Sequence, residues 1–121
     1  MALSEAWKGY RHAPEPGTPV CPLSEVPEAG TLCLNLGGFP LLLVNAGGAL
    51  RAWVNACPHQ YLPLDHKGSR LLSADGRVLR CTSHGAGFLA ETGEGVEGPG
   101  AGLALDPVPV ATGADGMVRI G

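Results

Sequence analysis

The chain has 121 residues, a formal net charge of −3 and an apolar content of 45%, which fits one globular domain. The negative charge gives no electrostatic reason to expect nucleic acid or an anionic membrane as a partner. No apolar stretch reaches the roughly 18 residues of a spanning helix, and the N-terminus lacks the basic and then apolar pattern of a secretory signal. We therefore expect a cytoplasmic protein, whose four cysteines serve as thiols or ligands rather than disulfides.

The first half of the chain predicts an arm followed by short strands. Residues 1–17 are polar and show no clear period, so we expect an N-terminal tail or loosely packed arm before one domain over residues 18–121. Residues 31–36 carry leucine at every second position, which predicts a strand. The Leu-Leu-Leu-Val run within residues 39–45 predicts a strand that is buried on both faces.

The remaining elements are also strands divided by turns. Four pairs predict turns between strands: Gly37-Gly38 before residues 39–45, Gly47-Gly48 before residues 50–55, Asp75-Gly76 between residues 70–73 and 77–80, and Asp115-Gly116 before residues 117–120. No sustained helical period follows residue 17. Short strands with glycine-rich turns indicate an antiparallel sandwich or barrel.

Two short segments each hold a cysteine and a histidine. Cys57 and His59 form a C-x-H pair, and Cys81 and His84 form a C-x-x-H pair. Thiolate and imidazole are good ligands for soft or borderline metals. The Asp75-Gly76 hairpin lies between the pairs and is able to bring them together. The spacing therefore predicts a metal centre on two loops.

Two other interpretations of these four residues stay open. A structural zinc site also uses two cysteines and two histidines, although it more often pairs C-x-x-C with helix-borne histidines. In the second interpretation, the four residues are unrelated core thiols and surface imidazoles. This interpretation requires both pairs to occur at these spacings by chance.

The two loops read CPHQYLPL and CTSHGAGF, and they resemble the signature of the Rieske iron–sulfur family, in its low-potential, ferredoxin-type branch. The resemblance extends to WVNACPH before the first loop and to ETGEGVEGPG and LDPVPV after the second. It implies an all-β, Rieske-type antiparallel β-sandwich with a small cluster-binding subdomain of two loops, at about residues 55–90.

The resemblance also implies the cofactor and its ligands. Cys57 and Cys81 would bind the inner iron of one 2Fe-2S cluster, and His59 and His84 would bind the outer iron. Neutral imidazoles raise the reduction potential relative to a cluster held by four cysteines. The histidine pair would provide the exit for the electron and couple reduction to protonation of the imidazoles.

Four positions differ from the respiratory branch of that family. Leu62 and Ser83 stand where that branch carries a disulfide between the loops. Ala86 and Phe88 stand where it carries Ser and Tyr hydroxyls that donate to the cluster and a ligand sulfur. With fewer donors, we predict a potential near the low end of the Rieske range, about −150 mV. Tyr61 occupies a position where many members have glycine.

The resemblance implies a small soluble one-electron carrier that passes electrons from a reductase to an oxygenase or other redox partner. We expect no chemistry of its own on a substrate, because the chain is too short for the mononuclear-iron domain of large oxygenase subunits. We expect a monomer, because small carriers are often monomers. Three alternatives stay open. They are an accessory subunit of a larger redox enzyme such as nitrite reductase, a zinc-stabilised interaction module, and a redox or iron sensor.

Five further residues are interpreted as follows. We expect Cys21 and Cys33 to be small strand residues outside the site. His12 and His66 are expected at the surface. Pro99 belongs either to a third loop that covers the cluster, as the resemblance implies, or to an ordinary turn.

Overall fold

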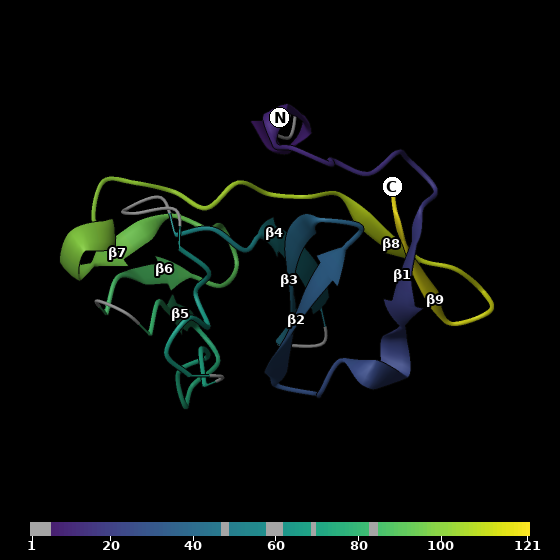
Figure 1. The fold of residues 1–121 in the computed structure, drawn as a ribbon. Helices are drawn as coiled ribbons and strands as arrows, with labels where there is room; N and C mark the ends of the chain where they lie inside the picture. Colours follow the sequence, from purple (N-terminus) through teal and green to yellow (C-terminus); the bar gives the residue numbers. More distant parts are fainter. Residues whose placement is uncertain (1–5, 47–48, 58–61, 69, 83–84) are drawn as a thin grey trace.

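The computed structural model describes residues 6–46, 49–57, 62–68, 70–82 and 85–121. The described residues form nine strands and three single turns of 3-10 helix (Figure 1). The strands are β1 (Pro19–Pro22), β2 (Gly30–Leu36), β3 (Phe39–Ala46), β4 (Ala49–Val54), β5 (Val78–Arg80), β6 (Gly87–Leu89), β7 (Gly95–Glu97), β8 (Val110–Thr112) and β9 (Met117–Ile120). The helical turns are η1 (Ala6–Gly9), η2 (Leu23–Glu25) and η3 (Gly98–Gly100). The prediction of an all-β fold is confirmed.

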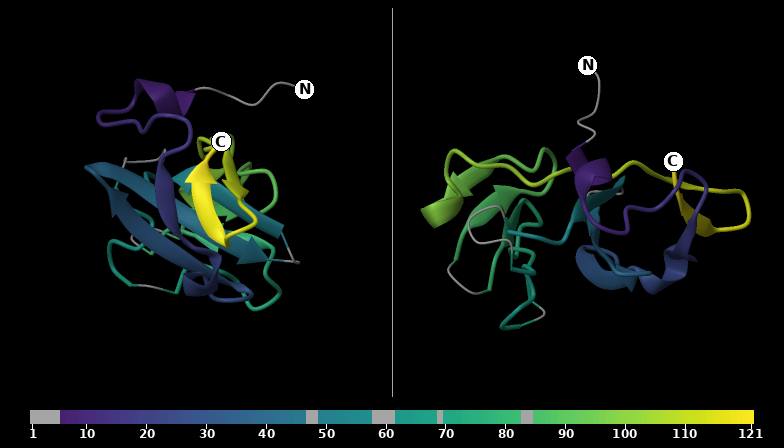
Figure 2. Two further views of the ribbon diagram at one scale, coloured as in Figure 1. Left: turned by 90° about the vertical axis from the view of Figure 1, so that its right-hand side faces the viewer. Right: turned by 45° about the horizontal axis from the view of Figure 1, so that its top comes forward.

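The strands pair into three antiparallel sheets of three strands each, in the orders β1-β9-β8, β2-β3-β4 and β5-β6-β7. In Figures 1 and 2 the sheet β2-β3-β4 lies between the other two, and the β5-β6-β7 sheet forms a lobe at one end. The cysteine-bearing segments lead into or out of this lobe, since one follows β4 and the other joins β5 to β6.

The predicted strand at residues 39–45 is confirmed as β3, and it is buried on both faces. Leu41 and Leu43 pack on one side, and Leu42 and Val44 pack on the other, with none of these side chains more than 1% exposed. Successive side chains of a strand point to opposite faces, so β3 contributes to two separate cores.

We call these two cores the loop-side core and the base core. The buried residues of the loop-side core are Leu42, Val44, Trp53, Cys57, Leu64, Leu71, Leu79, Cys81, Ala86, Phe88, Ala90 and Leu105. Those of the base core are Trp7, Cys21, Val26, Phe39, Leu41, Leu43, Ala52, Val54, Ala56, Val108 and Ile120. Both predicted cysteine ligands therefore belong to one core.

The predicted turns differ in how far the structure describes them. The Gly37-Gly38 turn joins β2 to β3, and both glycines have positive φ, of 61° and 100°, which glycine adopts without steric cost. The Gly47-Gly48 turn lies outside the described residues, although Ala46 pairs with Ala49 on either side of it. The Asp115-Gly116 turn joins β8 to β9 as predicted.

The hairpin at Asp75-Gly76 is confirmed, but its first strand is shorter than predicted. The N–H of Ser73 donates to the carbonyl of Val78 at 2.8 Å, which closes the turn. Before the turn, only Leu72 forms a β-bridge, with Leu79 of β5. The hairpin runs directly into Cys81, so it positions the second cysteine-bearing segment.

The N-terminal segment packs more closely than the sequence predicts. We expected a loosely packed arm over residues 1–17, whereas the Trp7 side chain in η1 is 2% exposed. Its ring meets the ring of Phe39 edge-on, with 6.3 Å between the centroids. The neighbouring residues in the sequence are polar, but the segment still packs on the domain because burying a large aromatic side chain is strongly favourable.

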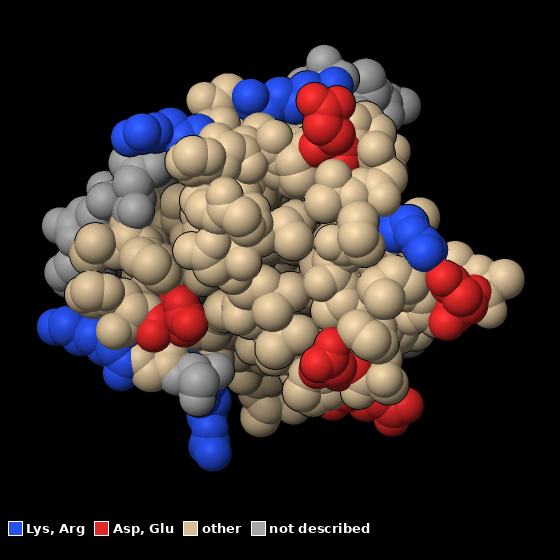
Figure 3. Space-filling model, turned by 45° about the vertical axis from the view of Figure 1, so that its right-hand side comes forward, with Lys and Arg blue, Asp and Glu red and all other residues tan. Residues whose placement is uncertain are grey.

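The charged side chains are spread over the surface. On the face seen in Figure 3, the described Lys, Arg, Asp and Glu side chains lie round the margin of a broad uncharged centre, and the two signs are interspersed. Among the described residues, no helix is long and apolar enough to cross a bilayer.

Candidate metal centre

Cys57 and Cys81 lie on two separate segments that meet in the loop-side core. Cys57 follows β4 and is 1% exposed, and Cys81 follows β5 directly and is 2% exposed. Two sulfur atoms from different segments therefore share one water-excluded region. His59 and His84, the two predicted imidazole ligands, lie outside the described residues, as does Tyr61. The set of four ligands stays a prediction.

The two cysteine-bearing loops close in the same way. The N–H of Cys57 donates to the carbonyl of Leu62 at 2.8 Å, and the N–H of Cys81 donates to the carbonyl of Ala86 at 2.8 Å. In both loops the acceptor lies five residues after the cysteine. In the second loop, the N–H of Gly85 also donates to the carbonyl of Cys81 at 2.9 Å, and Gly85 has a φ of +72°. Each cysteine is thereby fixed at the start of a closed turn.

The wall beside the second loop is apolar. Ala86 and Phe88 are completely buried in the same core as the two cysteines. Neither side chain carries a hydrogen-bond donor, so the hydroxyl groups expected in the respiratory branch have no counterpart at these positions. This environment matches the one from which we predict a low potential.

A third segment packs against the second loop. In η3, a Cβ placed on Gly98 would lie 3.2 Å from the carbonyl oxygen of Gly85, and one on Gly100 would lie 2.9 Å from Cζ of Phe88. The backbone around Pro99 therefore lies directly on the loop that follows Cys81. This placement agrees with a third loop at the site, and whether it covers a cluster stays a prediction.

Sequence reasoning missed two polar residues that hold the loops. Asn55 is 5% exposed, and its side chain accepts a hydrogen bond from the N–H of Leu64 at 2.8 Å and donates to Asp65 at 3.1 Å. Thr82 donates from its hydroxyl to the carbonyl of Leu64 at 2.8 Å. The available signal was a polar residue within two positions of each cysteine, but the group to which each polar side chain bonds is set only by the tertiary fold.

The other cysteines behave as the sequence predicts. Cys21 lies in β1 and Cys33 in β2, and neither forms a disulfide. Burial, followed by the charge of Asp65 and a hydrogen bond to it, raises the pKa of Cys33 to about 12. Burial and then the charge of Glu25 raise the pKa of Cys21. A protonated thiol is a poor nucleophile and metal ligand, so both residues fit a packing role.

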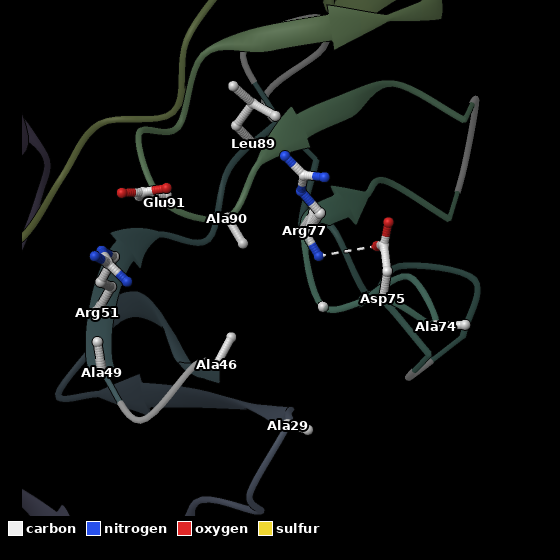
Figure 4. A pocket seen from close by; sticks show the side chains of 11 residues that line it. Ala29, Ala46, Ala49, Arg51, Ala74, Asp75, Arg77, Leu89, Ala90 and Glu91 are labelled. Carbon is white, nitrogen blue, oxygen red and sulfur yellow. Dashed lines mark hydrogen bonds between the residues drawn. The ribbon is translucent and has the colours of Figure 1, made fainter.

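One cavity among the described residues lies away from the cysteines. It has a volume of about 490 Å³ and is lined by Arg51, Asp75, Arg77, Glu91 and several alanines (Figure 4). It lies at the end of β5 and β6 where Val78 pairs with Leu89, whereas Cys81 follows the other end, where Arg80 pairs with Gly87. The cavity is therefore separate from the predicted metal centre.

Within the described ranges, which leave out His59 and His84, no three His, Cys, Asp or Glu side chains gather closely enough to hold a metal ion. The two buried cysteines, their closed loops and the apolar wall fit a thiolate-held iron–sulfur cluster. Buried sulfur ligands and limited solvent access are features that such clusters use.

The comparison with known proteins agrees with this fit. Residues 17–109 match the Rieske [2Fe-2S] domain. Because this match covers most of the chain, the chain belongs to the Rieske [2Fe-2S] domain family, whose members bind a 2Fe-2S cluster. No curated protein matches the chain closely.

Three solved structures show the same fold. The ferredoxin of carbazole 1,9a-dioxygenase from Nocardioides aromaticivorans IC177 is 21% identical, with a TM-score of 0.69 over 86% of this chain and 97% of that one. A chain in the complex of reduced oxygenase and oxidized ferredoxin in carbazole 1,9a-dioxygenase is 25% identical, with a TM-score of 0.68 over 85% and 91%. The terminal oxygenase from the same Nocardioides strain is 23% identical, with a TM-score of 0.68, and the match covers 85% of this chain but 29% of that one.

Proposed function

We propose that this chain is a one-electron carrier that takes electrons from a reductase and passes them to a terminal oxygenase or a similar redox partner. The observation that carries the proposal is the extent of the structural match. The match covers 97% of the length of the ferredoxin, but only 29% of the length of the terminal oxygenase. The similarity therefore spans nearly a whole ferredoxin but only a part of an oxygenase, which favours a carrier over a catalytic subunit.

In this proposal Cys57 and Cys81 hold the inner iron of one 2Fe-2S cluster, and His59 and His84 hold the outer iron. A bound cluster of this type supplies reversible one-electron transfer. The chain's own part is to exclude water and to fix its ligands. The side chains of Leu64, Ala86 and Phe88 are fully buried in the core that holds the two cysteines, and the proposal assigns electron exchange with a partner to the two predicted histidine ligands.

We also propose the finer properties that the sequence predicts. The potential is near −150 mV, at the low end of the Rieske range, because the apolar pair Ala86 and Phe88 adds no donor. The protein is a monomer and works in the cytoplasm, where the unpaired thiols of Cys21 and Cys33 are stable. Residues 1–17 form an N-terminal segment that packs, through Trp7, against the domain at 18–121.

The cofactor is tested by metal and acid-labile sulfide analysis of the purified chain, together with its visible and EPR spectra. We expect two irons and two sulfides per chain, a red-brown colour and a rhombic EPR signal after reduction by one electron. A colourless protein with one zinc per chain would support the zinc-stabilised module instead. Co-purification with a catalytic subunit would favour the accessory-subunit alternative.

The ligand set is tested by substitution. We expect His59→Ala and Cys81→Ser to abolish normal cluster assembly, because each removes an iron ligand. Cys21→Ser and Cys33→Ser serve as matched controls, and both should retain the wild-type iron content and spectrum. A full, unaltered cluster in the Cys81→Ser protein would contradict the assignment.

A further inference from the structure

Both backbone polar groups of Leu64 are bonded to the segments that carry the cysteines. Leu64 is completely buried. Its N–H donates to Oδ1 of Asn55 at 2.8 Å. Its carbonyl oxygen accepts two hydrogen bonds of 2.8 Å, from the N–H and the hydroxyl of Thr82. A buried peptide group that loses its partner is costly, so Leu64 strongly favours the arrangement in which both segments are in place.

The Asn55 end of this connection is rigidly held. Asn55 lies two residues before Cys57, and its N–H donates to the carbonyl of Pro40 in β3 at 3.0 Å. Its side-chain amide also donates to Asp65 at 3.1 Å. The asparagine is therefore fixed to the central sheet on one side and to Leu64 and Asp65 on the other.

The Thr82 end is held by one hydroxyl that acts both as a hydrogen-bond donor and as an acceptor. Thr82 follows Cys81, and its Oγ1 donates to the carbonyl of Leu64 and accepts from the N–H of Lys67 at 2.9 Å. The hydroxyl thereby joins the second cysteine-bearing segment to two points of the first. Leu62 and Ser83, the positions of the disulfide in the respiratory branch, cannot form one in this chain.

We propose that Asn55 and Thr82 are positioning residues that lock the two cysteine-bearing segments together through the peptide groups of Leu64, in place of a covalent link. This inference rests on the proposed function, because it requires that Cys57 and Cys81 bind the same cluster. When both segments are locked, the two sulfur atoms keep one spacing in both oxidation states. When the lock is weakened, the segments separate more often and the cluster is lost faster.

The experiment compares Thr82→Val with Thr82→Ser in the cluster-loaded protein. Valine has nearly the shape of threonine but removes the hydroxyl, whereas serine keeps it. We measure the rate at which visible absorption is lost in air with EDTA, and the EPR spectrum of the reduced protein. We expect cluster loss about tenfold faster and a broadened EPR signal for Thr82→Val, and rates within about twofold of wild type for Thr82→Ser.

Thr18→Val is the matched control. The Thr18 hydroxyl also donates to a backbone carbonyl, that of Glu15, at 2.6 Å, but it lies outside the cysteine-bearing segments. We expect its cluster-loss rate and EPR spectrum to equal those of wild type. Equal acceleration by Thr18→Val and Thr82→Val would show a general loss of stability and overturn the proposal. Wild-type behaviour of Thr82→Val would overturn it as well.

Asn55→Ala tests the other end of the connection. It leaves the buried N–H of Leu64 without an acceptor, so we expect cluster loss at least as fast as in Thr82→Val. A wild-type loss rate in this variant would remove Asn55 from the proposal. These outcomes are distinct from a failure of the proposed function, which would show as a wild-type chain that contains no iron and no sulfide.

Discussion

Tyr10 and Asp106 lie near opposite ends of the sequence, and the Tyr10 hydroxyl donates a hydrogen bond of 2.8 Å to Oδ2 of Asp106. The backbone carbonyl of Asp106 in turn accepts from the N–H of Val54 at 2.9 Å. The Tyr10 ring also meets Phe39 edge-on at 6.3 Å. These contacts tie the N-terminal segment to the base core and to the strand that precedes Cys57.

We therefore expect the N-terminal segment to contribute to stability. Trp7→Ala should lower the free energy of unfolding by about 3–5 kcal/mol, because it removes a buried aromatic side chain. Tyr10→Phe should lower it by about 1 kcal/mol, through the loss of one hydrogen bond. Urea unfolding of the cluster-loaded protein measures both, with the exposed Arg11→Ala as control. A Trp7→Ala protein as stable as the control would show that the segment is loosely packed after all.

Among the described glycines, Gly95 is the one at which an added Cβ would meet other atoms most closely. A Cβ there would lie 1.8 Å from the carbonyl oxygen of Gly100 and 2.8 Å from that of Leu103. Because both are backbone atoms, η3 and the segment after it must move. Gly95→Ala should lower the free energy of unfolding by at least about 2 kcal/mol. In Gly9→Ala the new Cβ meets no atom within 4 Å, so that variant should stay within about 0.5 kcal/mol of wild type. Equal stability of the two variants would contradict the close approach.

Cys33 should be unreactive in the native protein. Its pKa of about 12 lies well above the ordinary value of 9.0, so the thiolate is about a thousandfold scarcer at pH 8 than for an ordinary thiol. Alkylation by iodoacetamide, followed by mass spectrometry, should label Cys33 far more slowly in the native than in the urea-unfolded chain. Labelling at the same rate in both states would contradict burial beside Asp65.

The same raised pKa predicts a pH dependence of stability. Between pH 9 and about 12 the unfolded chain releases the Cys33 proton while the folded chain retains it. Rising pH in this window therefore favours unfolding, and below pH 9 the thiol has no effect. Unfolding free energies measured on either side of pH 9 should fall more steeply for wild type than for Cys33→Ala. If the unfolding free energies of wild type and Cys33→Ala changed equally with pH, the Cys33 thiol would not be the cause of the pH dependence.

A hydroxyl at position 86 should raise the reduction potential. Ala86 is buried in the core that holds both cysteines, and a serine there supplies the donor that the respiratory branch has. A hydrogen bond worth about 1 kcal/mol corresponds to about 40 mV for one electron, so we expect a rise of that order in Ala86→Ser. Ala90→Ser places the same change in the same core without a counterpart in the motif, and its potential should not change. Equal potentials for both serine variants would show that the donor is not at position 86.

Local patterns predicted the parts of the fold that depend on neighbouring residues. The alternation at residues 31–36 and the apolar run at 39–45 correctly located β2 and β3, because side-chain periodicity reflects burial directly. The buried position of Trp7 was not predicted, since one aromatic residue in a polar segment carries no period. The bonds of Asn55 and Thr82 to Leu64 join residues from different segments, and no local pattern encodes such pairs.

The predicted fold class is confirmed, whereas the set of four ligands stays a prediction because His59 and His84 lie outside the described residues. The burial of Cys57 and Cys81 in one core agrees with the prediction that they share a site, because the C-x-H and C-x-x-H spacings report ligand chemistry rather than packing. The close approach at Gly95 could not be predicted, because it depends on where the chain returns several residues later.

The double burial of β3 has a consequence for how the domain loses its structure. Leu42 stabilises the half that holds the cysteines, and Leu41 and Leu43 stabilise the half that holds the N-terminal segment. A single inserted residue in β3 would exchange these two sets, because every side chain after it would point the opposite way. The two halves therefore share β3, and a change of its register would disturb both of them at once. We expect the two halves to unfold together as one cooperative unit.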